Sequence, residues 1–396
     1  MPLKTHKLRT LTRFDYLALI VGLLSAIPIR IVGTFMAAEF LMFTLLPFLA
    51  PASFLKSKGV CIAFALCLLW LSGGIFSDLI NWTSLQNSLK GALSILLLAI
   101  CIIFAYCILK DNHRRFILFL IGYGVSSLLA FNFFQSAALS AIQSKTDLEI
   151  WKFYYYLPIT NAFLISFFYL GYKKIAIVLC QIFALYALFQ SSRNIFLTYS
   201  LSSVLMIFQV FIVSKSRHRR IKTYRESAWL LIVTFILALL CIKTTYEYLA
   251  TSGILGEAAK AKYHMQTAGQ DGFSFKAGRG DFYETLEKLS ENPIIGYGSY
   301  AYDKTPGHSM ILGAWAYQGI LGLPFWLYIS YVLIMYLYRY SIYDIPFSCA
   351  GIIVSTSQLW SILASPFQGR MRLAFLIVSI FVLIKTFNRN RKSTLK

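Results

Sequence analysis

Residues 91–109 read GALSILLLAICIIFAYCIL, a run without a charged side chain. An apolar run of about 18 or more residues is long enough to cross the hydrocarbon core of a bilayer as an α-helix. The connector KDNHRR follows at once, over residues 110–115, and is rich in Lys and Arg. This stretch therefore predicts a membrane-spanning helix that ends in a basic connector.

Similar apolar runs recur from one end of the chain to the other. Of the 396 residues, 58% are hydrophobic and only 13% are charged, which excludes an ordinary soluble domain. We expect an all-α polytopic membrane protein in which residues 1–396 form a single integral membrane domain. The twelve predicted helices lie near residues 15–29, 31–50, 59–77, 91–109, 115–134, 153–171, 173–190, 194–213, 228–246, 309–337, 345–364 and 371–387. The first resembles a signal peptide but lacks a clear cleavage site, so we expect it to be retained.

The basic residues predict which side of the membrane each connector faces. The net charge is +21, and most of the 37 Lys and Arg residues lie in short connectors between apolar runs. Such connectors usually face the cytoplasm, and KSRHRRIKTYR at residues 215–225 is the strongest marker. Twelve spans then leave both termini in the cytoplasm. The outer face carries five basic residues that this rule does not explain: Arg193, Arg279, His308, Arg370 and Arg372.

Cysteines and carboxylates give little sign of a metal site. The seven cysteines all lie within apolar runs and have no metal-type spacing, so we interpret them as small buried hydrophobic residues without disulfides. The nearest approach to an acidic metal-binding pair is Asp147 with Glu149, which is isolated. We therefore expect chemistry without a metal.

The long hydrophilic stretch at residues 247–308, between the ninth and tenth predicted helices, is the main outer loop. Within it, Phe282, Leu286 and Leu289 repeat at helical spacing, which predicts an amphipathic helix. Asn292-Pro293 ends this helix, and Gly296-Tyr297-Gly298 then predicts a turn. We expect the helix to lie at the membrane surface, above a cavity between the spans.

Two short motifs in this loop have more familiar interpretations, which we do not favour. Arg279-Gly280-Asp281 matches an adhesion tripeptide, but it opens a predicted helix and is not at an exposed loop tip. Gly296-Tyr297-Gly298 occurs in potassium-channel filters, but the preceding Thr-Val is missing and the span count is too high. Two further residues, Arg193 and His308, each have two possible roles. Arg193 is either functional or reaches out to the lipid headgroups, and His308 is either a base or a helix cap.

The order of these motifs resembles the O-antigen ligase and O-antigen polymerase superfamily of bacterial polysaccharide assembly. Its members show an Arg that opens the loop helix, then P-x-x-G-x-G, then His-Asn or His-Ser, then a G-x-x-G span. The resemblance covers roughly the last half of the chain. Its core is GRGDFYETLEKLSENPIIGYGSYAYDKTPGHSMILGAWAYQGILG, residues 278–322. The matching residues are Arg279, Pro293, Gly296, Gly298, His308, Ser309, Gly319 and Gly322.

This resemblance implies a membrane glycosyltransferase of the GT-C type at the periplasmic face of the bacterial inner membrane. Such enzymes transfer a glycan from an undecaprenyl diphosphate carrier to a second glycan, without a metal, a nucleotide sugar or another cofactor, and with expected inversion. The acceptor is another carrier-linked repeat unit in polymerases and lipid A–core in ligases. A chain-length regulator is a further expected partner, and nucleic acid is not.

The resemblance also implies roles for the outer-face residues. Guanidinium groups bind phosphate oxygens in a bidentate way and stabilise the charge that grows on a leaving diphosphate. Arg193 and Arg279 are expected in this role, and His308 is expected to orient the acceptor hydroxyl or take its proton. Additional contacts to diphosphate or sugar are expected from Arg370, Arg372, Tyr297, Tyr300 and Tyr302, although the tyrosines equally suit interfacial anchoring.

Several alternatives remain open. Ligases often carry His-Asn where this chain has His308-Ser309, which favours a polymerase, whereas the short chain favours a ligase. A transporter or flippase is the main rival outside the superfamily. Against it, the sequence shows no paired halves, no broken helices in matching positions, and few ionisable residues in mid-span apart from Glu39. A structural scaffold would leave the outer Arg and His residues unexplained.

Overall fold

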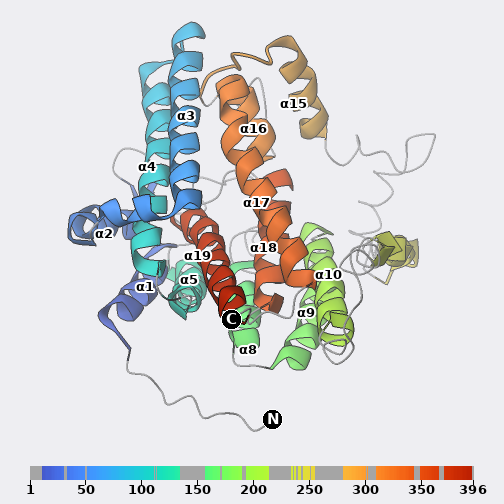
Figure 1. Ribbon diagram of the computed structural model, residues 1–396. Coiled ribbons are helices and arrows are strands. Elements are labelled where there is room, and N and C mark those ends of the chain that lie inside the picture. The colour runs from blue at the N-terminus through green and yellow to red at the C-terminus, as the bar shows by residue number, and fades with distance from the viewer. Residues whose placement is uncertain are drawn as a thin grey trace.

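The computed structural model shows a bundle of α-helices (Figure 1). It describes residues 11–30, 34–49, 51–110, 112, 114–133, 157–169, 172–189, 193–213, 233–234, 236–237, 240–241, 244–249, 251–254, 280–299, 301, 309–342, 348–364 and 370–394. The expectation of an all-α protein is confirmed for this part of the chain, which adds one two-stranded hairpin.

The first half of the chain forms these elements in order: α1 (Arg13–Leu24), β1 (Pro28–Arg30), β2 (Thr34–Met36), α2 (Ala37–Leu45), the 3₁₀ helices η1 (Leu46–Leu49) and η2 (Pro51–Lys56), α3 (Lys58–Ile80), α4 (Leu85–Leu109), α5 (Arg114–Phe133), α8 (Leu157–Tyr169), α9 (Lys173–Phe189) and α10 (Arg193–Ile207), which continues as the π-helix η4 (Phe208–Val213). The second half forms α15 (Gly280–Glu291), α16 (Met310–Gln318), the 3₁₀ turn η5 (Gly319–Gly322), α17 (Leu323–Ile342), α18 (Ser348–Ala364) and α19 (Arg370–Thr394).

Three helical stretches in the described ranges are long and apolar enough to cross a membrane: Lys58–Ile80, Leu85–Leu109 and Met310–Ser341. The second contains the run at 91–109 and is the most apolar of the three. These stretches give the chain the character of a membrane protein. Twelve spans are not shown, and the predicted helix at 228–246 lies largely outside the described residues.

One predicted span, at residues 31–50, is wrong as a single helix. The chain forms an antiparallel hairpin instead, with Pro28 opposite Met36 and Ile29 opposite Phe35. The helix α1 already ends at Leu24, and Pro28, which has no amide hydrogen to donate, is the first residue of β1. The β-branched residues Ile29 and Thr34 favour extended backbone. Only the short helix α2 and the 3₁₀ turn η1 remain of the predicted span.

A second predicted span, at residues 309–337, is helical but broken. Gly319 has a φ of 64°, in the left-handed region that favours glycine, and it separates α16 from α17. Gly322 then lies against the Ala314 carbonyl, so the two helices meet at a close bend. Broken helices are common in transporters, so this break favours a transporter more than the sequence does.

Aromatic packing joins α3 to the start of α17, which runs alongside it in Figure 1. Trp70 stacks on Phe325, with ring centroids 5.6 Å apart, and meets Trp326 edge-on at 5.4 Å. The Trp70 indole also donates a hydrogen bond of 3.0 Å to Gln318 Oε1 at the end of α16. This cluster therefore holds the break between α16 and α17 against the membrane helix α3.

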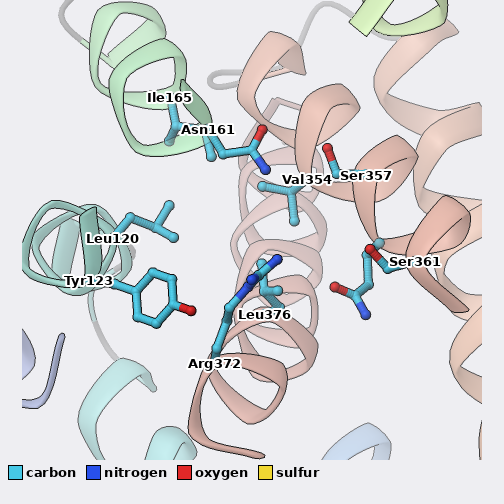
Figure 2. A pocket seen from close by; sticks show the side chains of 10 residues that line it. Leu120, Tyr123, Asn161, Ile165, Val354, Ser357, Ser361, Arg372 and Leu376 are labelled. Carbon is cyan, nitrogen blue, oxygen red and sulfur yellow. The ribbon is translucent and has the colours of Figure 1, made fainter. Parts of the chain in front are cut away.

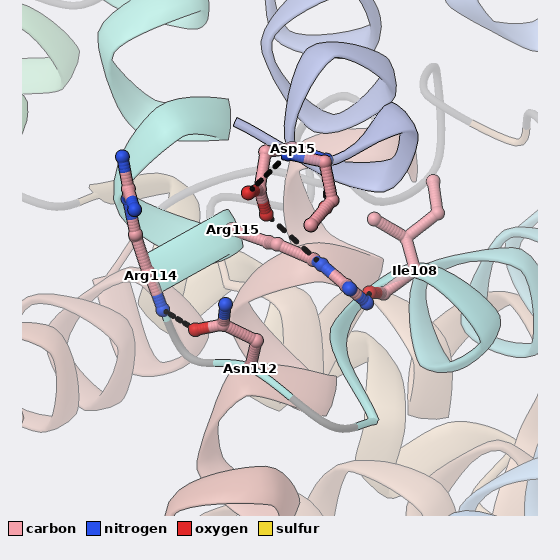
Figure 3. Close-up of polar contacts among 6 residues, drawn as sticks. Asp15, Ile108, Asn112, Arg114 and Arg115 are labelled. Atoms are coloured by element: carbon pink, nitrogen blue, oxygen red, sulfur yellow. Dashed lines mark hydrogen bonds and ion pairs between the residues drawn. The ribbon is translucent and has the colours of Figure 1, made fainter. Parts of the chain in front are cut away.

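A buried ion pair joins α1 to α5 (Figure 3). Asp15 is 2% exposed, and its carboxylate lies 3.2 Å from Arg115 Nε. Asp15 also caps α1 through the Thr12 amide at 2.9 Å. Arg115 donates a further hydrogen bond of 2.7 Å to the Ile108 carbonyl, at the C-terminal end of α4. The Arg115 guanidinium thus neutralises the Asp15 carboxylate and also binds the negative C-terminal end of α4.

A second buried ion pair joins three elements deep in the bundle. Glu39, at the start of α2, is 0% exposed and accepts from Arg370 Nε at 2.6 Å and from Arg370 Nη2 at 3.0 Å. Arg370 also donates to Ser94 on α4 at 3.2 Å, and its guanidinium lies 5.9 Å from the Phe35 ring. Ser94 lies about 14 Å along α4 from its first residue, at 1.5 Å per residue. The pair therefore sits well within the length of a membrane-crossing helix.

We predict that Arg370→Ala lowers the free energy of unfolding by about 3–5 kcal/mol, because it leaves the buried Glu39 carboxylate without a cation. The double variant Glu39→Gln with Arg370→Gln should recover most of this loss, since it removes both charges. The measurement is thermal unfolding of the full chain in detergent. Equal losses in the single and double variants would contradict the role of pairing. If Arg370 also contacts a substrate diphosphate, as the sequence predicts, the double variant will be stable but inactive.

Candidate functional site

The predicted amphipathic helix is present as α15 and packs against α16 (Figure 1). Leu289 is 3% exposed and faces the protein, as predicted, whereas Leu286 is 39% exposed. The side chain of Phe282 lies outside the described residues. The Trp315 indole donates a hydrogen bond of 2.7 Å to the Pro293 carbonyl. The end of α15 is therefore fastened to α16 at the start of the P-x-x-G-x-G motif.

The segment Pro293–Ser299, which we name the glycine turn, pairs with the C-terminal end of α16. The Tyr297 amide donates to the Ala316 carbonyl at 2.8 Å, and the Gly298 amide donates to the Tyr317 carbonyl at 3.0 Å. The last carbonyls of a helix lack partners within the helix and need donors from elsewhere. The glycine turn supplies these donors, which explains why α16 can end inside the protein.

Glycines from two separate parts of the motif touch in this turn. Gly296 has a φ of 79°, and a Cβ there would lie 2.6 Å from the Gly319 amide nitrogen. A Cβ on Gly319 would in turn collide with the Ile294 carbonyl, which accepts a hydrogen bond of 3.0 Å from the Ile320 amide. Only glycine fits at both positions. The P-x-x-G-x-G and G-x-x-G elements of the resemblance therefore form one structural unit.

Tyr297 anchors the glycine turn to α15. Its hydroxyl lies 2.9 Å from the Lys288 carbonyl and 3.0 Å from Glu291 Oε2. Partial burial and the neighbouring Glu291 carboxylate both raise the pKa of the Tyr297 phenol. Hydrogen bonds from Lys288 and then Tyr297 lower the pKa of Glu291. These contacts give Tyr297 a structural role, and its predicted stacking on a sugar stays a prediction.

A small cavity lined by both polar and apolar side chains lies among α5, α8, α18 and α19 (Figure 2). Its volume is about 20 Å³, which is room for about one water molecule. Figure 2 shows the Arg372 side chain between Tyr123 of α5 and the polar side chains of α18. The polar side chains that line the cavity are Tyr123, Asn161, Ser357, Gln358, Ser361 and Arg372. An apolar bundle thus contains a polar compartment beside a permanent cation.

Arg372 differs from Arg370 in its surroundings. Only Met371 separates the two residues on α19, yet Arg370 binds Glu39 whereas Arg372 lines the cavity. Arg372 lies 5.6 Å from the Tyr123 ring, and no hydrogen bond or ion pair to its guanidinium is found among the described residues. The Ser357 hydroxyl and the Gln358 amide nitrogen are also buried without a partner in that part of the chain. Such groups are costly unless a ligand or water satisfies them.

The cavity adjoins two segments that the sequence singles out. Ser309 follows His308 directly, caps α16, and donates a hydrogen bond of 3.2 Å to the Ile362 carbonyl of α18. The neighbouring Ser361 lines the cavity. On the other side, the Tyr199 hydroxyl of α10 donates to Asn161 Oδ1 at 3.1 Å. The helix α10 begins at Arg193, and through Tyr199 it contacts Asn161, which lines the cavity.

The structure describes only some of the predicted site residues. Arg279, Tyr300, Tyr302 and His308 lie outside the described residues, and so does the side chain of Arg193. Arg370 is paired with Glu39, whereas Arg372 lines the cavity. The described residues contain no group of three or more His, Cys, Asp or Glu side chains that could hold a metal ion.

Sequence reasoning did not single out the polar residues Asn161, Gln358 and Asp78 as parts of a site. A signal for Gln358 was its place as an amide within the apolar span 345–364. A signal for Asp78 was its position at the end of an apolar run, where an acidic side chain is unfavourable beside the helix C-terminus. Asn161 gave no comparable signal.

Comparison with protein families, with characterised proteins and with solved structures gives no match for this chain.

We predict that Gly296→Ala destabilises the protein far more than Gly253→Ala. Gly253 has nearly the same φ, 76°, but apart from its chain neighbours no described atom lies within 4 Å of the place of its Cβ. Its replacement therefore measures mainly the strain of the backbone. That strain is about 1–2 kcal/mol, and the clash at Gly296 should add about 1–3 kcal/mol. Thermal unfolding of the two variants checks this. Equal losses would show that the glycine turn is not packed on Gly319.

We also predict that Gln358→Leu leaves the free energy of unfolding unchanged or raises it. The amide nitrogen that it removes is buried and has no hydrogen-bond partner among the described residues. The matched control is Gln318→Leu. It should cost about 1–3 kcal/mol, because it leaves the buried Trp70 indole N–H without its acceptor. Chemical unfolding of both variants is the measurement. If Gln358→Leu lowers the free energy of unfolding as much as Gln318→Leu does, the Gln358 amide has a hydrogen-bond partner and the prediction is wrong.

Proposed function

We propose that this chain is a membrane glycosyltransferase that polymerises undecaprenyl-diphosphate-linked oligosaccharide repeat units into O-antigen or capsule. The site would face the periplasm, in a bacterial inner-membrane protein with about twelve spans, a GT-C-like arrangement, an outer loop at 247–308 and both termini in the cytoplasm. The observation that carries the proposal is the contact between Gly296 and Gly319. The two halves of the resembling motif meet there, and His308 lies between them in the sequence.

The chemistry that we propose moves one glycosyl group. The acceptor hydroxyl oxygen forms a bond to the anomeric carbon of the donor while the bond from that carbon to the diphosphate oxygen breaks. His308 takes the hydroxyl proton, and the diphosphate leaves on its lipid as an anion. Arg193 and Arg279 would stabilise the charge that develops on the leaving group. This transfer needs no metal and no other cofactor.

Arg372 supports the same proposal from the described part of the chain. Its guanidinium lines a polar cavity inside a bundle of apolar helices, and a charge in such a place usually marks function. If the cavity widens when substrate enters, a lipid diphosphate would place an anion beside the Arg372 guanidinium. Asn161, Ser357 and Gln358 would offer hydrogen bonds to the adjacent sugar hydroxyls.

Two other functions remain candidates. A ligase would use the same donor and transfer the glycan to lipid A–core. A transporter or flippase for a polar anion is favoured by two observations, the break between α16 and α17 at Gly319 and the cavity beside Arg372. Neither observation requires bond-making chemistry, so the experiment must separate transfer from transport.

We predict that deletion of the gene leaves surface lipopolysaccharide in which the core bears a single repeat unit, as seen on a gel. Bare core with accumulated carrier-linked polymer would instead identify a ligase. Complementation with Arg193→Ala, Arg279→Ala or His308→Ala should restore less than about 1% of the wild-type polymer, in line with the loss of a charge-stabilising or proton-transferring group.

The control for this experiment is Lys288→Ala. Lys288 is an exposed cation on α15, the helix that Arg279 precedes. Among the described residues, its ammonium forms an ion pair with the surface residue Glu291. Its replacement should restore the full ladder at the same protein level. Full restoration by both Arg279→Ala and His308→Ala would overturn the transferase and favour the transporter.

A further inference from the structure

We propose that Asp78, at the end of α3, is the positioning residue that fixes the glycine turn and, through it, the segments that carry Arg279 and His308. Asp78 is 4% exposed, and its two carboxylate oxygens accept from a single residue. The Ser299 amide donates to Oδ1 at 2.5 Å, and the Ser299 hydroxyl donates to Oδ2 at 2.9 Å. The effect on activity rests on the function proposed above, but the effect on the turn does not.

Among the described residues, the hydrogen bonds to the Asp78 carboxylate come from Ser299. In the ranges that the structure describes, no Lys, Arg or His nitrogen lies within 4 Å of the Asp78 carboxylate, unlike those of Asp15 and Glu39. Asp78 also lies in the last turn of α3, where the helix dipole disfavours a negative charge. A buried carboxylate in this position needs its hydrogen-bond donors, and hydrogen bonds to a charged group are the strong ones.

Two neighbours of Asp78 hold the rest of the turn. The Ser77 hydroxyl accepts from the Gly298 amide at 3.0 Å and donates to the Tyr317 carbonyl at 2.9 Å, so it links the turn to α16. The Asn81 amide nitrogen donates to the Gly296 carbonyl at 3.0 Å. Three polar side chains at the C-terminal end of α3 thus contact Gly296, Gly298 and Ser299 of the glycine turn.

Close packing gives the contact a single geometry. A Cβ on Gly298 would lie 3.1 Å from Asp78 Oδ1, and a Cβ on Gly91 of α4 would collide with the Ser299 side chain. Ser299 therefore sits in a fitted site between α3 and α4. From this site the chain leads back to α15, which follows Arg279, and onward over nine residues to His308.

The position of Asp78 explains what it would do for the reaction. Asp78 contacts the glycine turn, so it would act on the groups that we assign to chemistry by fixing the ends of the segments on which they lie. A displacement of about 1 Å of a reacting group can lower a rate about a hundredfold. Loss of the Asp78 contact should therefore lower the rate of transfer without changing the charge of the site.

The test combines hydrogen exchange with activity in four variants of the full chain. Asp78→Ala removes both acceptors, and Ser299→Ala removes one donor with little risk to folding. Asp78→Asn is the conservative variant, because its oxygen still accepts from the Ser299 amide. Asp15→Ala is the matched control, since it removes a buried carboxylate that is remote from the turn. Exchange is followed by mass spectrometry in detergent, and activity by the polymer ladder at equal protein level.

We expect Asp78→Ala to speed amide exchange across residues 296–299 by at least about tenfold, and to lower polymer by at least about tenfold. Ser299→Ala should show a smaller change in both, and Asp78→Asn should lie near wild type. Asp15→Ala should lower thermal stability without speeding exchange in this peptide. If Asp78→Ala does not fold, Ser299→Ala decides the outcome.

Two results would overturn the proposal. The first is unchanged exchange at 296–299 in both Asp78→Ala and Ser299→Ala. The second is faster exchange with undiminished polymer, while Arg279→Ala and His308→Ala are inactive, because the turn would then be held by Asp78 without serving the reaction. Failure of the transferase itself is recognised separately, by full polymer in Arg279→Ala and His308→Ala.

Discussion

Backbone atoms of the glycine turn and of the break between α16 and α17 approach more closely than any side chain would allow. Gly296 and Gly319 both have a positive φ. The Gly319 amide lies against the place of a Cβ on Gly296, and the Ile294 and Ile295 carbonyls lie where a Cβ on Gly319 would be. This approach lets the turn donate its amides to the last carbonyls of α16. The position of α15, the bend into α17 and the contact with α3 all follow from it. The site is thus organised around backbone hydrogen bonds and not around a packed side chain.

Long helices were predictable from the sequence because they depend on length and hydropathy alone. The run at 91–109 lies within α4, and α3, α5, α9, α10, α18 and α19 also lie close to predicted spans. The hairpin at 28–36 and the break at Gly319 were missed because both occur within apolar sequence. Hydropathy does not distinguish a strand or a bend from a continuous helix in such a run. The hairpin begins at Pro28 and the break occurs at Gly319, so both depend on backbone conformation and not on hydropathy.

The site was predictable only as a set of residue types. Charge on the outer face pointed to both Arg370 and Arg372, but it could not separate them, because their difference lies in which partner each side chain meets. Glu39 reaches Arg370 from far away in the sequence, and the cavity at Arg372 combines side chains from four helices. Asp78 was hidden for the same reason. Its partner, Ser299, is 221 residues away and acquires its role only when the glycine turn is folded.

The pair of Glu39 and Arg370 has a consequence for the synthesis of this protein. The two residues are 331 positions apart, so the N-terminal helices meet the membrane long before the ribosome has made α19. Until then Glu39 lacks the Arg370 guanidinium that pairs with it in the folded chain, and a lone charge in an apolar setting is costly unless it stays near water. The arrival of the last helix supplies the missing charge and completes the bundle. A chain cut short before α19 would keep an unmatched acid in its interior, which gives quality control a way to tell an unfinished molecule from a finished one.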